Sequence, residues 1–148
     1  MNLKHKKILA VLFAAVLLLL LGAWKKPSHS GDELKKLGMN PTMGRTTLRI
    51  DSRTGVRESG ILQAVIECGD SAPGQIREDP RWKSLPLDED TRKLCYEELR
   101  EIGKFLPKTE DGAYLLLSQH SGDADQYDFL LAVYSAIQNS IYYVEVKI

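Results

Sequence analysis

The stretch AYLLLSQHSGDADQYDFLLAVYSAIQNSIYYVEVKI, residues 113–148, decides the fold of this chain. It opens with AYLLLS, an almost wholly apolar run that is typical of a strand buried on both faces. It closes with IYYVEVKI, in which alternation points Tyr142 and Val144 toward a core and Tyr143 away from it. Both ends are predicted to be strands, so the fold depends on what joins them.

The segment between these strands has a helical period. Its larger apolar residues recur at i, i+3, i+4, i+7 and i+10, and they are Tyr127, Leu130, Leu131, Tyr134 and Ile137. This spacing predicts an amphipathic helix over residues 124–138. Many of the same residues favour strands, so a hairpin strand is the alternative. With the helix, the last three elements form a β-α-β unit with parallel strands.

The upstream sequence supplies three more elements. TTLRID, residues 46–51, and ILQAVIE, residues 61–67, predict two strands that pair as a hairpin. Residues 88–106 predict a helix that Asp88 caps and that buries a stripe containing Cys95 and Leu106. The order β-β-α-β-α-β predicts an α+β fold over residues 45–148, a small two-layer domain with a mixed sheet.

The N-terminal region predicts a membrane segment. Residues 8–24, ILAVLFAAVLLLLLGAW, carry no charge, and their 17 residues are at the short end of what spans a bilayer. We expect a transmembrane signal anchor running from Ile8 through Leu17 to an interfacial Trp24. A cleaved signal peptide is the alternative, although the end of the run is a poor match to an A-x-A cleavage site.

The anchor implies a layout for the whole chain. Residues 1–7 would be a basic cytoplasmic tail, residues 25–44 a linker rich in Pro, Gly and Ser, and residues 45–148 the folded domain. A short basic tail before a first apolar segment usually stays in the cytoplasm. We therefore expect a single-pass protein of the bacterial inner membrane with its C-terminal domain in the periplasm.

The charge distribution argues against nucleic-acid binding. Five lysines and no acid lie in residues 1–26, so residues 27–148 keep 15 Lys and Arg against 20 Asp and Glu, a net charge of −5. An acidic domain with scattered arginines lacks the basic patch that binds phosphate backbones. We expect no nucleic-acid partner.

His120, with Asp123, Asp125 and Asp128 close behind it, is the most conspicuous polar cluster. A calcium loop starting at Asp123 would need a glycine at its sixth position, where the chain has Asp128. A zinc site needs several His or Cys ligands, and no nucleophile motif is present. Asp123 with Gln126 instead resembles a helix capping box. We expect no catalytic residue, no metal and no cofactor.

A few other residues are candidates for structural or binding roles. Cys68 and Cys95 could form one disulfide in an oxidising compartment, or Cys95 could be a core residue of its helix. Trp82, in a Pro-rich charged loop, is either a lid over the core or an exposed anchor for a partner. Tyr143 and His120 are weaker candidates for partner contact.

Residues 113–148, together with LDEDTRKLCYEELREIGKFLPK before them, resemble the TolR/ExbD family of biopolymer-transport proteins. The resemblance implies one membrane helix, a small periplasmic domain and a membrane or envelope protein as partner, with homodimerisation a further option. It departs from the family in one respect: residues 8–24 contain no acid, whereas the family's membrane helix carries an aspartate of the proton path.

Two functions follow from these observations. The first is a membrane-anchored, non-enzymatic envelope protein whose extracytoplasmic domain binds a protein or cell-wall partner, as a TolR/ExbD-like accessory. The second is a periplasmic inhibitor or immunity protein that neutralises a toxin or hydrolase, with the acidic group Asp88, Glu89 and Asp90 meeting a basic target. An enzyme that uses His120 is the least favoured class.

Overall fold

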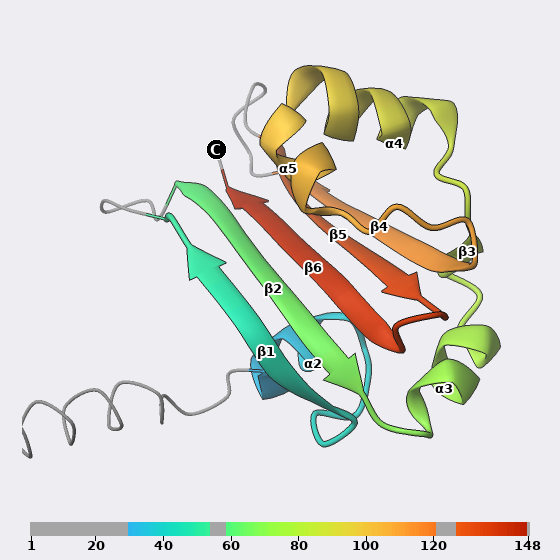
Figure 1. Ribbon diagram of the computed structural model, residues 1–148. Coiled ribbons are helices and arrows are strands. Elements are labelled where there is room, and N and C mark those ends of the chain that lie inside the picture. The colour runs from blue at the N-terminus through green and yellow to red at the C-terminus, as the bar shows by residue number, and fades with distance from the viewer. Residues whose placement is uncertain (1–29, 54–58, 121–126, 148) are drawn as a thin grey trace, which may run out of the picture.

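The computed structural model describes residues 30–53, 59–120 and 127–147. These residues build a sheet in the order β1-β2-β6-β5-β4-β3, in which every neighbouring pair is antiparallel (Figure 1). The strands are β1 (Gly44–Asp51), β2 (Gly60–Cys68), β3 (Lys83–Ser84), β4 (Gly112–His120), β5 (Tyr127–Ser135) and β6 (Ser140–Lys147). The predicted β1–β2 hairpin and the two outer strands of residues 113–148 are confirmed.

The prediction of a mixed sheet is wrong. It relied on a helix over residues 124–138 and on a parallel β-α-β unit. Tyr127–Ser135 is strand β5, which pairs with β4 on one side and β6 on the other, so the hairpin alternative is correct. The run from Phe129 to Tyr134 is buried on both sides of the sheet. A strand covered on both faces has no period of two, so its apolar residues matched a helical spacing by coincidence.

The helices are short. They are α2 (Ser30–Lys36), α3 (Ala72–Glu78), α4 (Glu89–Lys93) and α5 (Arg100–Phe105), with a π-helical turn, η1 (Leu94–Glu98), between the last two. The predicted helix over 88–106 begins where expected, because Asp88 accepts a hydrogen bond of 2.8 Å from the Thr91 backbone N–H. It is not continuous, because Leu99 leaves helical geometry at φ −118° and ψ 63°. The α+β class predicted for the domain is therefore replaced by an antiparallel sheet with short helices.

Two apolar cores lie on opposite faces of the sheet. We call one of these faces the α2 face. Its core contains Leu34 of α2, Leu37 just after that helix and Ile76 of α3, which pack against Ile66 and Tyr143 of the sheet. On the α4 face, Cys95 and Ile102 pack against residues that include Leu131, Val133 and Val144. Burial of these side chains on both faces supplies the main stabilising term for the sheet.

The segment predicted as a linker belongs in part to the folded domain. From Ser30 onward it forms α2 and a turn, and Leu34, Leu37, Met39 and Met43 are all buried in the core of the α2 face. The domain therefore starts before residue 45.

The membrane prediction needs a correction. Over residues 30–53, 59–120 and 127–147, no helix is long and apolar enough to cross a bilayer. The longest, α2 and α3, have seven residues each, about 10 Å against the roughly 30 Å of a hydrocarbon core. Residues 8–24, including Ile8, Leu17 and Trp24, lie outside the described residues. The transmembrane signal anchor and the inner-membrane location with a periplasmic domain are therefore not retained.

Candidate functional site

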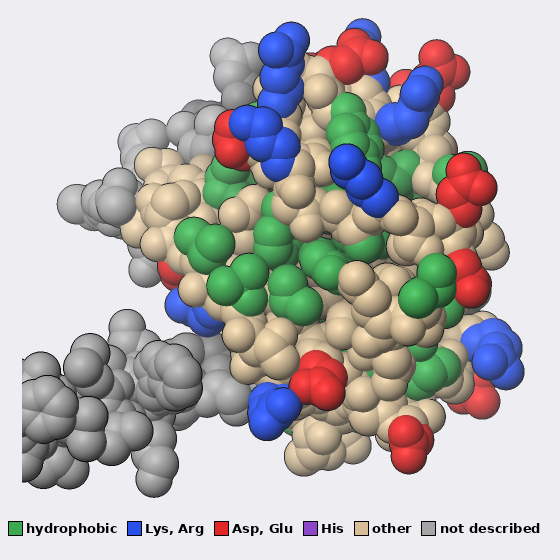
Figure 2. All heavy atoms as spheres, viewed as in Figure 1, with side chains coloured by type: hydrophobic (Ala, Val, Ile, Leu, Met, Phe, Trp, Pro, Cys, Tyr) green, Lys and Arg blue, Asp and Glu red, His purple; other side chains and the backbone are tan. Residues whose placement is uncertain are grey.

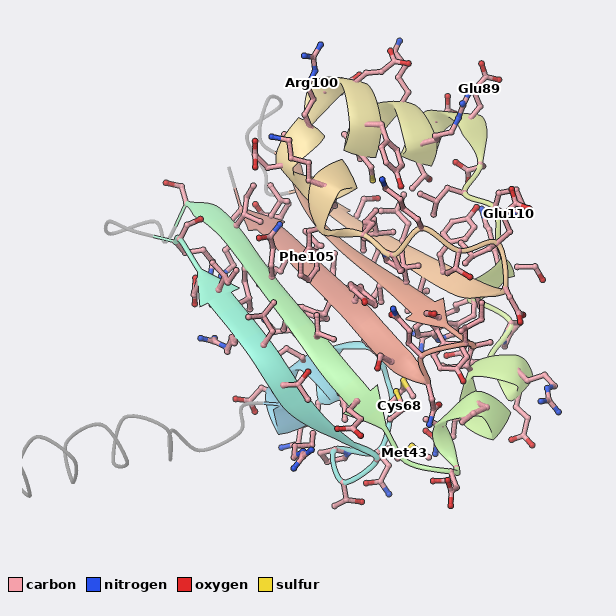
Figure 3. The ribbon with its side chains drawn as sticks, viewed as in Figure 1. Met43, Cys68, Glu89, Arg100, Phe105 and Glu110 are labelled. Carbon is pink, nitrogen blue, oxygen red and sulfur yellow. The ribbon has the colours of Figure 1, made fainter. Side chains whose placement is uncertain are left out.

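The α4 face is only half covered. The layer of α4, η1 and α5 lies over β4, β5 and β6 (Figure 1). This helical layer ends at Phe105, the last residue of α5 (Figure 3). The Phe105 ring packs edge-on against Tyr142 of β6, with 5.5 Å between the ring centroids. Beyond that contact, β1 and β2 carry apolar side chains that no helix of the described chain covers. We call this set the open half-face, and its members are Leu48, Ile50, Val65 and Ile61, the last of which also packs against the core of the α4 face.

The open half-face exposes large apolar side chains. Leu48 is 45% exposed and Ile50 is 50% exposed, while Ile61 and Val65 beside them are half-buried. Figure 2 shows hydrophobic side chains gathered over β1, β2 and β6 next to the helical layer. Isolated exposed apolar residues are common, but a group gathered on one sheet face, here around Gln63 opposite Ile50, is typical of an interaction surface.

A β-bulge determines which residues of β1 reach this face. The register shifts between Thr46, opposite Ile66, and Leu48, opposite Val65, so Thr47 is the extra residue. Thr46 therefore lies on the α2 face, whereas strict alternation along TTLRID would place it on the same face as Leu48 and Ile50. The bulge leaves Leu48 and Ile50 on the α4 face.

β1 is also an edge strand of the sheet. The Ser52 backbone N–H donates to the Ile61 carbonyl at 2.9 Å, so Ser52 directs its backbone groups toward β2. Because alternate residues of an antiparallel strand point the same way, Leu48 and Ile50 do likewise, and Arg49 and Asp51 direct theirs outward. The outer edge thus presents main-chain donors and acceptors beside an apolar surface.

A buried charged cluster fixes β1 from the opposite face. Glu145 of β6, 7% exposed, contacts Lys36 of α2 at 2.7 Å and Arg53 at 3.4 Å, and it accepts the Tyr143 hydroxyl at 2.7 Å. Burial alone would raise the pKa of Glu145, but the hydrogen bonds from Lys36 and Tyr143 outweigh it and lower the pKa. The carboxylate therefore stays charged and ties α2 to β6 and to the end of β1.

A second carboxylate repeats this arrangement nearer the edge. Glu33 of α2, 3% exposed, pairs with Arg49 of β1 at 3.3 Å through one oxygen. Its other oxygen is buried without a hydrogen-bond partner among the described residues. A cavity of about 370 Å³ lies here, lined by Asp32, Glu33, Lys35, Lys36, Arg49, Arg53 and Leu62. Because Lys36, Arg49 and Arg53 of this lining already pair with carboxylates, we interpret the cluster as the support of the edge strand.

The two cysteines lie apart. Cys68 belongs to the core of the α2 face and Cys95 to the core of the α4 face, and both are free thiols. The disulfide that the sequence left open is not formed, and Cys95 is the core residue of the alternative interpretation. Burial raises the pKa of each thiol to about 11.

The aromatic candidates for partner contact are buried. Trp82 is 9% exposed and belongs to the core of the α2 face, as the lid interpretation expects. Tyr143 is fully buried, because α2 covers the face that alternation assigned to solvent. His120 ends β4, pairing with Tyr127 across the ladder, and the predicted capping box at 123–126 lies outside the described residues.

Within the described ranges, no group of three or more His, Cys, Asp or Glu residues could hold a metal ion. Sequence reasoning missed the open half-face and the Glu145 cluster. For the first, TTLRID carried a signal: an alternating strand near one end of the domain. For the second, no local signal exists, because Lys36 and Glu145 are 109 residues apart.

Comparisons of the chain with protein-family models, with curated proteins and with solved structures give no match. The TolR/ExbD resemblance therefore stays a prediction. The strand–helix–strand order that contributed to it is strand–strand–strand in the structure.

Proposed function

We propose that this chain is a non-enzymatic binding protein that recognises an extended segment of a protein partner along β1. The partner adds a strand to the outer edge of β1 and lays apolar side chains on the open half-face. In this mode of recognition, main-chain hydrogen bonds provide affinity and alternate side chains provide specificity. The observation that carries the proposal is the combination of two features: an edge with which no other strand of the described residues pairs, and Leu48 and Ile50, each about half exposed, on one face.

The rigidity of the edge supports this role. Salt bridges join Arg49 to Glu33 and Arg53 to Asp51 and Glu145, so β1 is held on α2 and β6 as well as on β2. A partner strand would therefore meet an ordered template and would not have to order the edge itself, which lowers the entropic cost of association.

Site-specific photo-crosslinking in cells tests the proposal. A photoreactive amino acid replaces Leu48 in the full chain, and the matched control replaces Ile137, an apolar residue that is 76% exposed in the β5–β6 turn. We expect a discrete crosslinked band from position 48 that is absent from position 137 and that weakens when Ile50→Arg is added. Equal labelling from both positions, or none from position 48, would contradict the proposal.

The inhibitor alternative rests on the acidic group at 88–90. Asp88 is engaged within the fold, since it caps α4, accepts the Tyr114 hydroxyl at 2.7 Å and pairs with Lys83 at 3.6 Å. Glu89 and Asp90 are exposed in the first turn of α4. Their charge near a helix N-terminus is sufficiently explained by the helix dipole, so we place this function second.

A further inference from the structure

We propose that the partner strand at this edge is β1 of a second copy of the chain, paired antiparallel about a two-fold axis at Ile50. This inference rests on the proposed function and names its partner. It follows from the direction of the backbone groups and from the order of charges along residues 48–52.

Hydrogen-bond parity restricts the registers of such a pair. Outward-directed residues pair with outward-directed residues, so Arg49 and Asp51 of one copy face Arg49 or Asp51 of the other. Three registers satisfy this condition on the part of β1 that follows the bulge at Thr47. Their two-fold axes pass through Arg49, Ile50 or Asp51. An axis at Arg49 places the two arginines opposite each other, and an axis at Asp51 places the two aspartates opposite each other.

Of these three registers, only the axis at Ile50 places opposite charges across from each other. An axis at Ser52 would bring Asp51 to Arg53 of the other copy, but Ser52 lies past the end of β1 at Asp51. In that register Arg49 of each copy faces Asp51 of the other, both on the α2 face. Like charges directly opposite destabilise a strand pair and opposite charges stabilise it. An axis at Leu48 would run the pairing through the bulge at Thr47, where the backbone direction changes.

The same register joins the apolar surfaces. Ile50 of one copy meets Ile50 of the other in a non-hydrogen-bonded pair, where side chains approach most closely. Leu48 and Ile50 both lie on the α4 face and are 45% and 50% exposed. The two open half-faces would then meet across the axis, so that both copies contribute the same surface patch, as in every two-fold interface.

Cysteine crosslinking of the full chain tests the register. Ile50→Cys places two thiols across the axis with Cβ atoms about 4.5–5.5 Å apart, close to disulfide geometry. Leu48→Cys is the matched control, because Leu48 is exposed on the same face. In this register it lies opposite Ser52 of the other copy, so the two introduced cysteines of a dimer would be about 13 Å apart. The native thiols are buried with raised pKa values and react slowly.

We expect Ile50→Cys to form crosslinked dimers at least about tenfold faster than Leu48→Cys under mild oxidation. Sedimentation of the unmodified full chain should show a dimer that Ile50→Arg converts to a monomer. Faster crosslinking from Leu48→Cys, equal crosslinking from both, or a monomeric unmodified chain would overturn the self-pairing. The photo-crosslinking experiment separates the two proposals. If the crosslinked band contains this chain and a different protein, the partner is not a second copy, but the strand-addition function still holds.

Discussion

Tyr143 and Glu145 lie two residues apart on the α2 face of β6, and the tyrosine hydroxyl donates a 2.7 Å hydrogen bond to a carboxylate oxygen. The same oxygen, Oε2, also contacts Lys36 of α2. Burial, and then this hydrogen bond, raise the pKa of Tyr143, so the phenol remains a donor at every physiological pH. The pair makes a polar contact inside an apolar core. Removing this hydrogen bond should change the free energy of unfolding by a measurable amount.

Tyr143→Phe should destabilise the domain by about 1–2 kcal/mol, because it removes a buried hydrogen bond to a charged acceptor. Urea unfolding followed by circular dichroism measures the change. Tyr142→Phe is the control: its hydroxyl donates to Gln138 near the surface, and the expected change is below about 0.5 kcal/mol. Equal effects of the two substitutions would contradict the role assigned to Glu145.

Gly112→Ala should be far more damaging. Gly112 begins β4 at φ +152°, and a Cβ there would lie 1.8 Å from the Tyr134 carbonyl oxygen. The backbone would have to separate β4 from β5, so we expect a loss of about 3 kcal/mol or more in unfolding free energy. Gly74→Ala in α3 is the matched control, since a Cβ at that position meets nothing within 4 Å. It should leave stability unchanged or raise it by up to about 1 kcal/mol.

Thiol titration should distinguish the native state from the unfolded state. Cys68 and Cys95 are buried, so an aromatic disulfide reagent should label neither at an appreciable rate in the native protein. In denaturant without reductant, both should react at once. The Cys95→Ala variant should then give half the signal. A chain that yields no reactive thiol after unfolding would contain a disulfide, contrary to the structure.

Stability should fall in acid. Hydrogen bonds from Arg53 lower the pKa of Asp51 to about 2, and those from Thr91 lower the pKa of Asp88 to about 2. A group whose pKa is lowered in the folded state stabilises it fully above its ordinary value near 4, and this contribution is lost as pH falls toward 2. The urea midpoint should therefore drop between pH 5 and pH 2.5. Asp51→Asn should flatten this dependence, and a midpoint independent of pH would contradict it.

The sequence allows some strands to be predicted because their periods are local. IYYVEVKI alternates, TTLRID and ILQAVIE flank a loop, and AYLLLS is a short apolar run between polar segments, so each carries a strand signal of its own. The run around Phe129 and Val133 does not, because burial on both faces removes the alternation. Only the pairing with β4 and β6 makes it a strand.

The candidate site could not be predicted for a different reason. Leu48 and Val144 look alike as apolar positions of alternating strands, yet Val144 is fully buried and Leu48 is 45% exposed. The difference arises because Leu99 interrupts the helical layer and α5 ends at Phe105, over β6. Coverage by another element is a tertiary property, so the alternation of residues 46–51 indicates an apolar strand face but not that this face is left uncovered.

The sheet order has a consequence for how the chain is made. β6, the last strand in sequence order, lies between β2 and β5 near the middle of the sheet. As the chain emerges from the ribosome, β1–β2 and β4–β5 can each form a hairpin, but among the described residues no strand pairs with both hairpins until residues 140–147 are free. A premature stop before Ser140 would therefore leave two separate halves with exposed inner edges, a product prone to aggregate rather than a shortened domain.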